Sequence, residues 1–312
     1  MEIGYDIEQQ KNAQPKAVTV GFFDGVHVGH RFLISELRRI ADERGLKTAI
    51  VTFEEHPGKV LRSGYCPQLI TTKEEKTEEF EKLGIDYCYF LRFTPDMASL
   101  PAKEFMKKLL KEQIGASVLL VGYDHRFGKG RNESFDEYVK YGNELGIEVL
   151  AVPPFLNDNE ASSSSAVRRL ILDGKMREAA KLLNRPYKIE GRVVAGFGVG
   201  HDLGFPTANL RFSTDKILPP EGVYAVKVLI EQMPRPYDGM LYIGKRPTLN
   251  NGENSSVEVN IFDFNENIYN RKLVVEVIER MRDDARFDSI SVLREQLEKD
   301  KRAALTILRD KL

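Results

Sequence analysis

The sequence predicts a doubly wound α/β domain followed by an antiparallel β-barrel domain with a C-terminal helix. Two observations lead to this fold class: strands alternate with helices up to residue 184, and short strands without intervening helices come after it. The change falls at Arg185-Pro186, which ends a helix. With 312 residues the chain exceeds one ordinary domain, so we predict two domains, over residues 1–184 and 185–312.

Short apolar runs rich in β-branched residues predict the strands of the first domain, at 17–20, 47–53, 86–93, 117–121 and 147–152. Helical spacing of apolar residues predicts helices at 31–44, 72–83, 102–113, 135–145 and 175–184. Thr72 and Glu75 resemble a capping box. Such alternation indicates a parallel sheet covered on both faces, in which ligands bind beyond the carboxyl ends of the strands.

The second domain is predicted from short strands at 187–194, 223–230, 239–243, 257–262 and 272–278. Asn251-Gly252 is a hairpin signal between two of them. Runs of short strands with turn residues favour an antiparallel barrel. The stretch 289–312 has the apolar spacing of a helix that packs on this barrel.

Composition indicates an ordinary globular protein, with 42% hydrophobic and 30% charged residues. A net charge of −1 does not indicate a nucleic-acid or membrane partner. Cys66 and Cys88 are the only cysteines, which suggests reduced thiols. No apolar run approaches a membrane span, and residues 1–12 are too polar for a signal peptide. We therefore expect a cytoplasmic protein; the sequence does not indicate an oligomeric state.

The stretch from Gly21 to His30 connects the first predicted strand to the first predicted helix. Its glycines let backbone amides approach a ligand, and His27 and His30 stand at the helix start, where unpaired N–H groups favour an anion. This suits a polyphosphate whose α-phosphorus is attacked. The alternatives are a plain turn with two surface histidines, or a zinc site, for which a third ligand is missing nearby.

The same stretch resembles the H-x-G-H motif of nucleotidylyltransferases, in the form G-x-F-D-G-x-H-x-G-H of the bifunctional riboflavin kinase/FAD synthetases. This resemblance implies a nucleotidylyltransferase-type, Rossmann-like first domain. It also implies that Gly21, Phe23, Asp24, His27 and His30 bind nucleotide, and that the two histidines are catalytic.

Two more segments at predicted strand ends resemble motifs of this family. Residues 52–57 are similar to T-F-x-x-H-P, although a plain turn before a proline explains them almost as well. Residues 122–128 are similar to G-x-[DN]-x-x-F-G, in which Asp124 would contact nucleotide and Arg126 would lie near phosphate.

Residues 163–168 resemble the second nucleotidylyltransferase signature, S-S-T-x-[IV]-R, with Ser165 where the family usually has threonine. Hydroxyls of Ser164 and Ser165 at a helix start, followed by Arg168, would make a second phosphate cradle. The alternative is a serine N-cap with a surface arginine.

In the second half, residues 200–209 resemble the riboflavin kinase signature G-x-x-L-G-F-P-T-A-N. The resemblance implies that Gly198, in the glycine cluster before this signature, binds nucleotide. The family usually has a basic residue at the position of His201 or Asp202. Thr207 and Asn209 offer hard oxygens to a Mg²⁺ shared with ATP phosphates, and they are our predicted metal and nucleotide ligands. The alternative role is turn formation after Pro206.

Glu258 alternates with apolar neighbours on a predicted strand, and the family resemblance makes it the base of phosphoryl transfer. Asn260 replaces the usual histidine of V-E-x-H-I-F-D-F. Taken alone, such a glutamate is usually only solvated. Residues 239–245 nearly fit a Walker A loop, but Arg246 replaces its Ser/Thr and the segment is strand-like, so we predict a strand and turn there.

The resemblance implies two reactions: ATP phosphorylates riboflavin to FMN in the second domain, and FMN attacks a second ATP in the first domain to give FAD and pyrophosphate. ATP, riboflavin and FMN would be the partners and Mg²⁺ the cofactor. The alternatives are an adenylyltransferase for another acceptor, a flavin-binding regulator without catalysis, and an RNA-binding protein. The near-neutral charge argues against the last.

Overall fold

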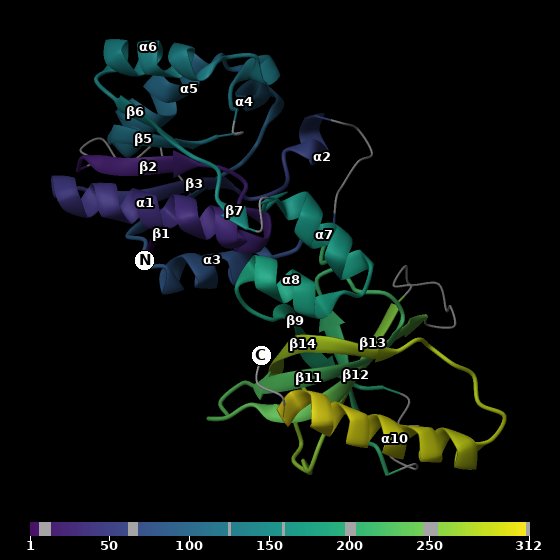
Figure 1. Cartoon of the computed structure of the whole chain (residues 1–312). Coiled ribbons are helices and arrows are strands. Elements are labelled where there is room, and N and C mark those ends of the chain that lie inside the picture. Colours follow the sequence, from purple (N-terminus) through teal and green to yellow (C-terminus); the bar gives the residue numbers. More distant parts are fainter. Residues whose placement is uncertain are drawn as a thin grey trace. The chain divides into compact units, whose positions relative to one another are not determined.

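The computed structural model describes residues 1–5, 14–61, 68–123, 126–157, 160–196, 204–245 and 255–309. Contacts within the chain group it into two units, Met1–Ser164 and Ser165–Leu312 (Figure 1). Each unit is described by itself below. The predicted fold class is confirmed in both.

The first unit is built on a parallel six-stranded sheet in the order β1-β4-β3-β2-β5-β6. Its strands are β1 (Glu2–Gly4), β2 (Lys16–Val20), β3 (Lys47–Phe53), β4 (Tyr87–Leu91), β5 (Ala116–Gly122) and β6 (Glu148–Val152). Five of the six lie where the sequence predicts them. The edge strand β1 was missed because it is only three residues long and gains its strand character from pairing with β4.

Helices cover both faces of this sheet (Figure 1). They are α1 (Val28–Arg44), α3 (Lys73–Lys82), α5 (Ala102–Phe105), η3 (Met106–Ile114) and α6 (Phe135–Leu145), with short turns α2 (Gly58–Leu61), α4 (Pro95–Ser99), η2 (Asp24–Val26) and η4 (Lys129–Arg131). The predicted capping box is confirmed: Thr72 Oγ1 accepts from the Glu75 amide, and the Thr72 amide donates to Glu75 Oε2. A small hairpin, β7 (Leu156–Asn157) and β8 (Glu160–Ala161), follows the sheet.

The helix predicted at 102–113 has π-type hydrogen bonding over most of its length, in η3. Its buried residues Met106, Leu110 and Ile114 are four apart, so this wider winding keeps them on the core side. A sequence pattern of apolar spacing does not distinguish the two windings.

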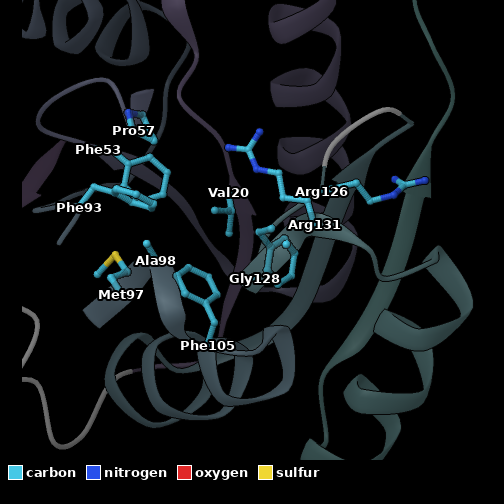
Figure 2. Close-up of a pocket in the computed structure, with 12 residues that line it drawn as sticks. Val20, Phe53, Pro57, Phe93, Met97, Ala98, Phe105, Arg126, Gly128 and Arg131 are labelled. Atoms are coloured by element: carbon cyan, nitrogen blue, oxygen red, sulfur yellow. The ribbon is translucent and has the colours of Figure 1, made fainter. Parts of the chain in front are cut away.

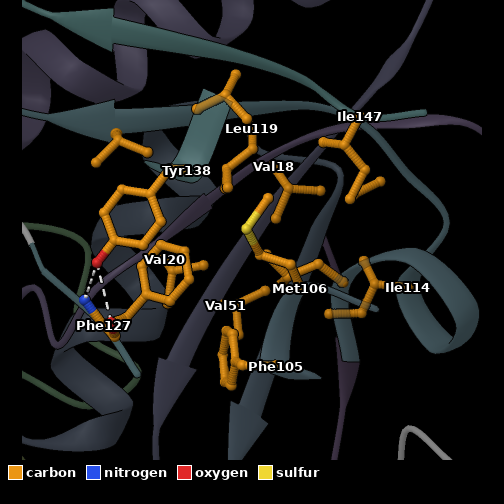
Figure 3. Packing of buried hydrophobic residues seen from close by; sticks show 14 of the residues in the cluster. Val18, Val20, Val51, Phe105, Met106, Ile114, Leu119, Phe127, Tyr138 and Ile147 are labelled. Atoms are coloured by element: carbon orange, nitrogen blue, oxygen red, sulfur yellow. Dashed lines mark hydrogen bonds between the residues drawn. The ribbon is translucent and has the colours of Figure 1, made fainter. Parts of the chain in front are cut away.

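Strand alternation produces two separate cores. Val18 and Val20 contribute to the cluster under η3 and α6 (Figure 3), whereas Ala17 faces the cluster under α1 and α3. Cys88 is buried and forms no disulfide, as predicted; Cys66 lies outside the described residues. Burial raises the pKa of the Cys88 thiol to about 12.

The second unit begins within α7 (Ser164–Leu172), whose first residue belongs to the first unit. It also contains α8 (Met176–Leu183) and a closed antiparallel barrel. The barrel order is β10-β13-β12-β11-β14-β9, with β9 (Tyr187–Val194), β10 (Thr207–Phe212), β11 (Gly222–Ile230), β12 (Tyr237–Lys245), β13 (Ser255–Ile261) and β14 (Lys272–Arg282). The Walker-like segment 239–245 lies within β12, so it is a strand as predicted. The hairpin signal Asn251-Gly252 falls outside the described residues.

Two additions close and cover this barrel. The strand β10 was not predicted, and it closes the barrel by pairing with both β9 and β13. The predicted terminal helix is α10 (Ile290–Arg309), and buried Asp300 ties it to β14 by accepting hydrogen bonds from Arg282 Nε and Nη2 at 3.0 and 2.8 Å.

Tyr138 makes the first stability prediction. Its buried hydroxyl donates to the Phe127 carbonyl at 2.9 Å and accepts from the Phe127 amide at 3.0 Å (Figure 3). Tyr138→Phe keeps the ring but removes both bonds, so the free energy of unfolding of the first unit should fall by about 1–3 kcal/mol. Urea denaturation measures this; a change below about 0.5 kcal/mol would show that these bonds contribute no net stability.

Candidate active sites

The loop between β2 and α1 has an unusual backbone. Phe23 and Val26 have φ angles of 55° and 43°, in the left-handed region that side chains other than glycine rarely adopt. A Cβ atom at Gly21 would lie 2.9 Å from the Phe23 ring, so the close packing of this turn requires glycine there. The loop therefore follows a single, tightly specified path from the end of β2 to the start of α1.

Asp24 fastens this loop to the segment before α3. Its buried carboxylate accepts hydrogen bonds from the amides of Ile70 at 2.9 Å and Thr71 at 3.1 Å. The Gly25 amide in turn donates to Thr71 Oγ1 at 2.9 Å. The Asp24 side chain thus stabilises the conformation of the loop. Its predicted contribution to nucleotide binding would therefore come from the backbone amides whose position it fixes.

His27 and His30 are brought together as the sequence predicts. Their rings stack with centroids 3.7 Å apart, and His27 is the N-cap residue of the 17-residue helix α1. The Phe23 ring is buried and packs edge-on against His30 at 5.1 Å, so it supports the histidine pair from the core. Imidazoles at a helix N-terminus, with its unpaired N–H groups and dipole, suit an anionic ligand.

A polar cavity of about 240 Å³ opens in front of this histidine pair. Besides the loop, its wall includes Tyr123, Phe155 and the serines 162–164. Ser164 Oγ donates to the Asp24 carbonyl at 2.9 Å, which joins the second predicted signature to the loop. Ser165 and Arg168 follow on α7 in the second unit, and their roles remain predictions.

A second cavity of about 290 Å³ is apolar and aromatic (Figure 2). Phe53, Phe93 and Phe105 line it, with the rings of Phe53 and Phe93 in edge-to-face contact at 5.4 Å. Arg126 and Arg131 also lie on its wall (Figure 2). Val20, the last residue of β2, lines both cavities. The two spaces therefore adjoin at the carboxyl end of the sheet, and together they can hold a planar apolar group beside a polyanion.

The other strand-end segments also reach this region. Thr52 is buried and donates to the Phe22 carbonyl at 3.2 Å, and His56 packs edge-on against the Phe22 ring at 4.7 Å. The segment 52–57 is therefore part of the loop's support. Arg126 lines the aromatic cavity, whereas Asp124 lies outside the described residues.

The second unit has its own cluster of oxygen atoms. The register of β10 and β13 places Asn209 opposite Glu258. Thr207 Oγ1 donates to one carboxylate oxygen of Glu258 at 3.1 Å, and Ser256 Oγ donates to the other at 2.9 Å. Glu258 is thus half-buried and held by hydrogen bonds to both of its carboxylate oxygens, and its role as a base stays a prediction.

Neighbouring backbone groups fix this cluster. A Cβ atom at Gly196 would lie 1.9 Å from Asn209 Nδ2, so the chain passes the amide at a distance that only glycine permits. Asn260 Nδ2 donates to the Pro206 carbonyl at 2.7 Å and so holds the start of β10. Gly198 and His201 lie outside the described residues.

The donor chemistry of this cluster fits Mg²⁺. Hydroxyl, amide and carboxylate oxygens are the ligands that this hard cation prefers, together with phosphate. In the part of the chain that the structure describes, no three His, Cys, Asp or Glu side chains gather into a cluster that could hold a metal ion by themselves. A cavity of about 400 Å³ beside Thr207, walled also by Phe264, Asn267 and Tyr269, has room for a nucleotide group.

Sequence reasoning missed the aromatic cavity. A signal was present, since Phe53 ends β3, Phe93 follows the end of β4 by two residues and Phe127 lies in the segment after β5. Because parallel strands end at one edge, aromatic residues there gather in one place.

Family models match both halves of the chain: FAD synthetase over residues 9–166 and riboflavin kinase over residues 183–308. The bifunctional riboflavin kinase/FMN adenylyltransferase of Bacillus subtilis is 36% identical over 304 residues, which cover 95% of this chain and 93% of the relative. The chain belongs to this family. The enzyme of that name from Escherichia coli K12 is 35% identical over 288 residues, which cover 92% and 91% of the two chains. The resemblance recognised in the sequence is confirmed.

One solved structure that is similar to the present chain is named for a different function from the relatives above. It is called a macrolide-efflux protein, from Streptococcus pneumoniae, and it is 33% identical, with a TM-score of 0.88 and 97% of both chains covered. Within the described part of the present chain, no helix combines the length and apolar character that crossing a membrane requires.

Proposed function

We propose that the second unit phosphorylates riboflavin to FMN with ATP, and that the first unit joins FMN to the AMP part of a second ATP, giving FAD and pyrophosphate. The observation that carries this proposal is the match of two family models, in order along the chain, each over one of the two sites described above. Relatives named for both activities cover nearly the whole chain.

In the kinase reaction, the Glu258 carboxylate accepts the proton of the terminal ribityl hydroxyl. The hydroxyl oxygen then forms a bond to the γ-phosphorus of ATP as the bond from that phosphorus to ADP breaks. Ser256 orients the carboxylate through its 2.9 Å hydrogen bond. Thr207 and Asn209 would hold Mg²⁺, which supplies charge neutralisation of the phosphates.

In the adenylyl transfer, a phosphate oxygen of FMN forms a bond to the α-phosphorus of ATP, and the bond to pyrophosphate breaks. His27 and His30 donate hydrogen bonds to the phosphate oxygens, where negative charge is greatest. The flavin ring occupies the aromatic cavity against Phe53 and Phe93, with Arg126 beside the FMN phosphate. Neither reaction needs a covalent enzyme intermediate.

The remaining assignments belong to the same proposal. Asp124, Ser165 and Arg168 contact nucleotide in the first reaction, and Gly198 contacts ATP in the second. The functional boundary lies near residue 185, although α8 packs against β9 and β14 of the barrel. We propose a cytoplasmic enzyme that binds small-molecule substrates and neither nucleic acid nor membrane, since its net charge is nearly neutral.

Incubation of the full chain with riboflavin, ATP and Mg²⁺, followed by chromatography of the flavins, tests the function. FMN should form first and FAD should follow. A protein that binds flavin without converting it would be a regulator, and one that adenylylates only another acceptor would contradict the proposal.

The boundary makes a prediction about fragments. Residues 185–312 and residues 165–312 should each make FMN and no FAD. The shorter fragment should have the lower melting temperature because it lacks α8, whose Met176, Ala179 and Leu183 are buried. Thermal unfolding and the flavin assay measure both properties. Two soluble fragments that leave riboflavin unchanged would argue against separate modules.

The histidine pair makes a second prediction. Replacing His27 and His30 by alanine should lower the rate of FAD synthesis by about 10²–10³ for each lost donor to the phosphates. FMN formation by the other unit should persist, and it serves as the internal control. Equal loss of both activities in a folded protein would mean that the histidines do not serve adenylyl transfer.

The substitution Glu258→Gln makes a third prediction, about the kinase reaction. Glutamine keeps the size of the side chain but cannot take up the hydroxyl proton, so kinase turnover should fall by about 10²–10⁴. We expect the loss at the lower end of this range because phosphoryl transfer has a loose transition state. Glu276→Gln is the matched control, since Glu276 lies on β14 and pairs with Lys188. Near-parental turnover of Glu258→Gln would place the base elsewhere.

A further inference from the structure

Lys76, on α3, is a buried lysine directly behind the loop of the first unit. Its side chain is 3% exposed. Nζ donates to the Phe22 carbonyl at 2.9 Å and to Thr52 Oγ1 at 3.3 Å, and it lies 4.2 Å from the centroid of the Phe22 ring. One ammonium group therefore contacts the backbone and the ring of the residue where the loop leaves the sheet. Neither the sequence patterns nor the mechanism above uses it.

The charged and titratable groups around Lys76 come from three elements. Asp24 of η2 favours the charged amine, Lys73 of the same helix disfavours it, and the Cys88 thiol of β4 lies nearby. Burial has the largest effect and lowers the pKa of Lys76 from 10.5 to about 8. Keeping the Lys76 ammonium group charged in this buried position at neutral pH lowers the free energy of unfolding. We therefore look for a functional role of this charge.

The position of Phe22 explains what that benefit is. Four residues lie between Phe22 and His27, and two of them, Phe23 and Val26, have left-handed backbones that the surroundings must hold in place. Asp24 fixes the middle of this stretch through Ile70 and Thr71. Lys76 fixes the beginning of the stretch at Phe22. It does so from α3, the helix that follows Ile70 and Thr71 in the sequence. With both anchors in place, the histidine pair has one orientation.

We propose that Lys76 is a positioning residue for adenylyl transfer: its ammonium group holds Phe22 so that the loop presents His27 and His30 to the triphosphate. This inference rests on the proposed function of the first unit. It requires the charge as well as the hydrogen bond, because the cation–π contact with Phe22 and the attraction to Asp24 both vanish when the amine is neutral.

Lys16 provides a matched control. It is 2% exposed, donates to the Gln14 and Ile114 carbonyls at 3.1 Å and lies 4.8 Å from the Tyr87 ring centroid. Burial lowers its pKa as well. It is therefore another buried lysine with carbonyl and aromatic contacts, but it stands at the opposite end of β2 from the loop.

The experiment compares Lys76→Met, Lys76→Gln and Lys16→Met in the full chain, with FMN and ATP as substrates. Both Lys76 variants should lose about tenfold to a hundredfold in kcat for FAD synthesis, as expected when catalytic groups are misplaced, with little change in the KM for FMN. Lys16→Met should retain kcat within about twofold. FMN formation from riboflavin should be unchanged in all three.

A pH profile separates positioning from stability. Between pH 8 and 10.5 the unfolded chain binds a proton at Lys76 that the folded chain has lost, so the stability of the parent relative to Lys76→Met should rise with pH. Over the same interval its advantage in FAD synthesis should fall, because the amine loses its charge. A purely structural lysine would move both quantities in the same direction.

The outcomes are distinct. If the parent makes no FAD, the proposed function fails. If the parent makes FAD and the Lys76 variants match Lys16→Met, only the role of Lys76 is wrong. Failure of both Lys76 variants to fold, or a proportional loss of FMN and FAD formation, would likewise assign Lys76 to stability alone and overturn the inference.

Discussion

The buried hydrogen bonds from the Ile70 and Thr71 amides to the Asp24 carboxylate are the interaction on which the first site depends. They join two segments that the sheet alone would leave separate, the loop after β2 and the residues before α3. The left-handed backbones of Phe23 and Val26 cost about 1–3 kcal/mol each, and such contacts offset that cost. Because these contacts fix the loop, they also fix the start of α1 and its two histidines, which preorganises them toward a polyphosphate.

The second site depends on a different constraint, the closure of the barrel. The strand β10 pairs with β13 on one side and with β9 on the other, and this register places Asn209 opposite Glu258. A shift by one residue would turn either side chain to the other face of the barrel. Phosphate chemistry therefore rests on loop anchoring in one unit and on strand register in the other. In the mechanism proposed for both units, the polypeptide chiefly positions charges and forms no covalent intermediate.

The sequence predicted the parts of this structure that local patterns determine. Strand alternation, the Thr72–Glu75 capping box and the side of β13 that carries Glu258 follow from spacing within one element. What was missed depends on contacts between distant segments. The strand character of β10 comes from its two partners, the aromatic cavity from three strand ends, and the inward orientation of Asp24 and Lys76 from packing of α3 against the loop. Family resemblance supplied residue roles that no local pattern carries.

The central claim is that a loop held in one conformation by its own contacts presents His27 and His30 to the α-phosphate of ATP. A crystal structure of the full chain with the α,β-methylene analogue of ATP tests it most directly. We expect the α-phosphate within hydrogen-bonding distance of both imidazoles, with Phe23 and Val26 still in the left-handed region. A nucleotide bound away from the histidine pair, or a loop that abandons these backbone angles to receive it, would contradict the account.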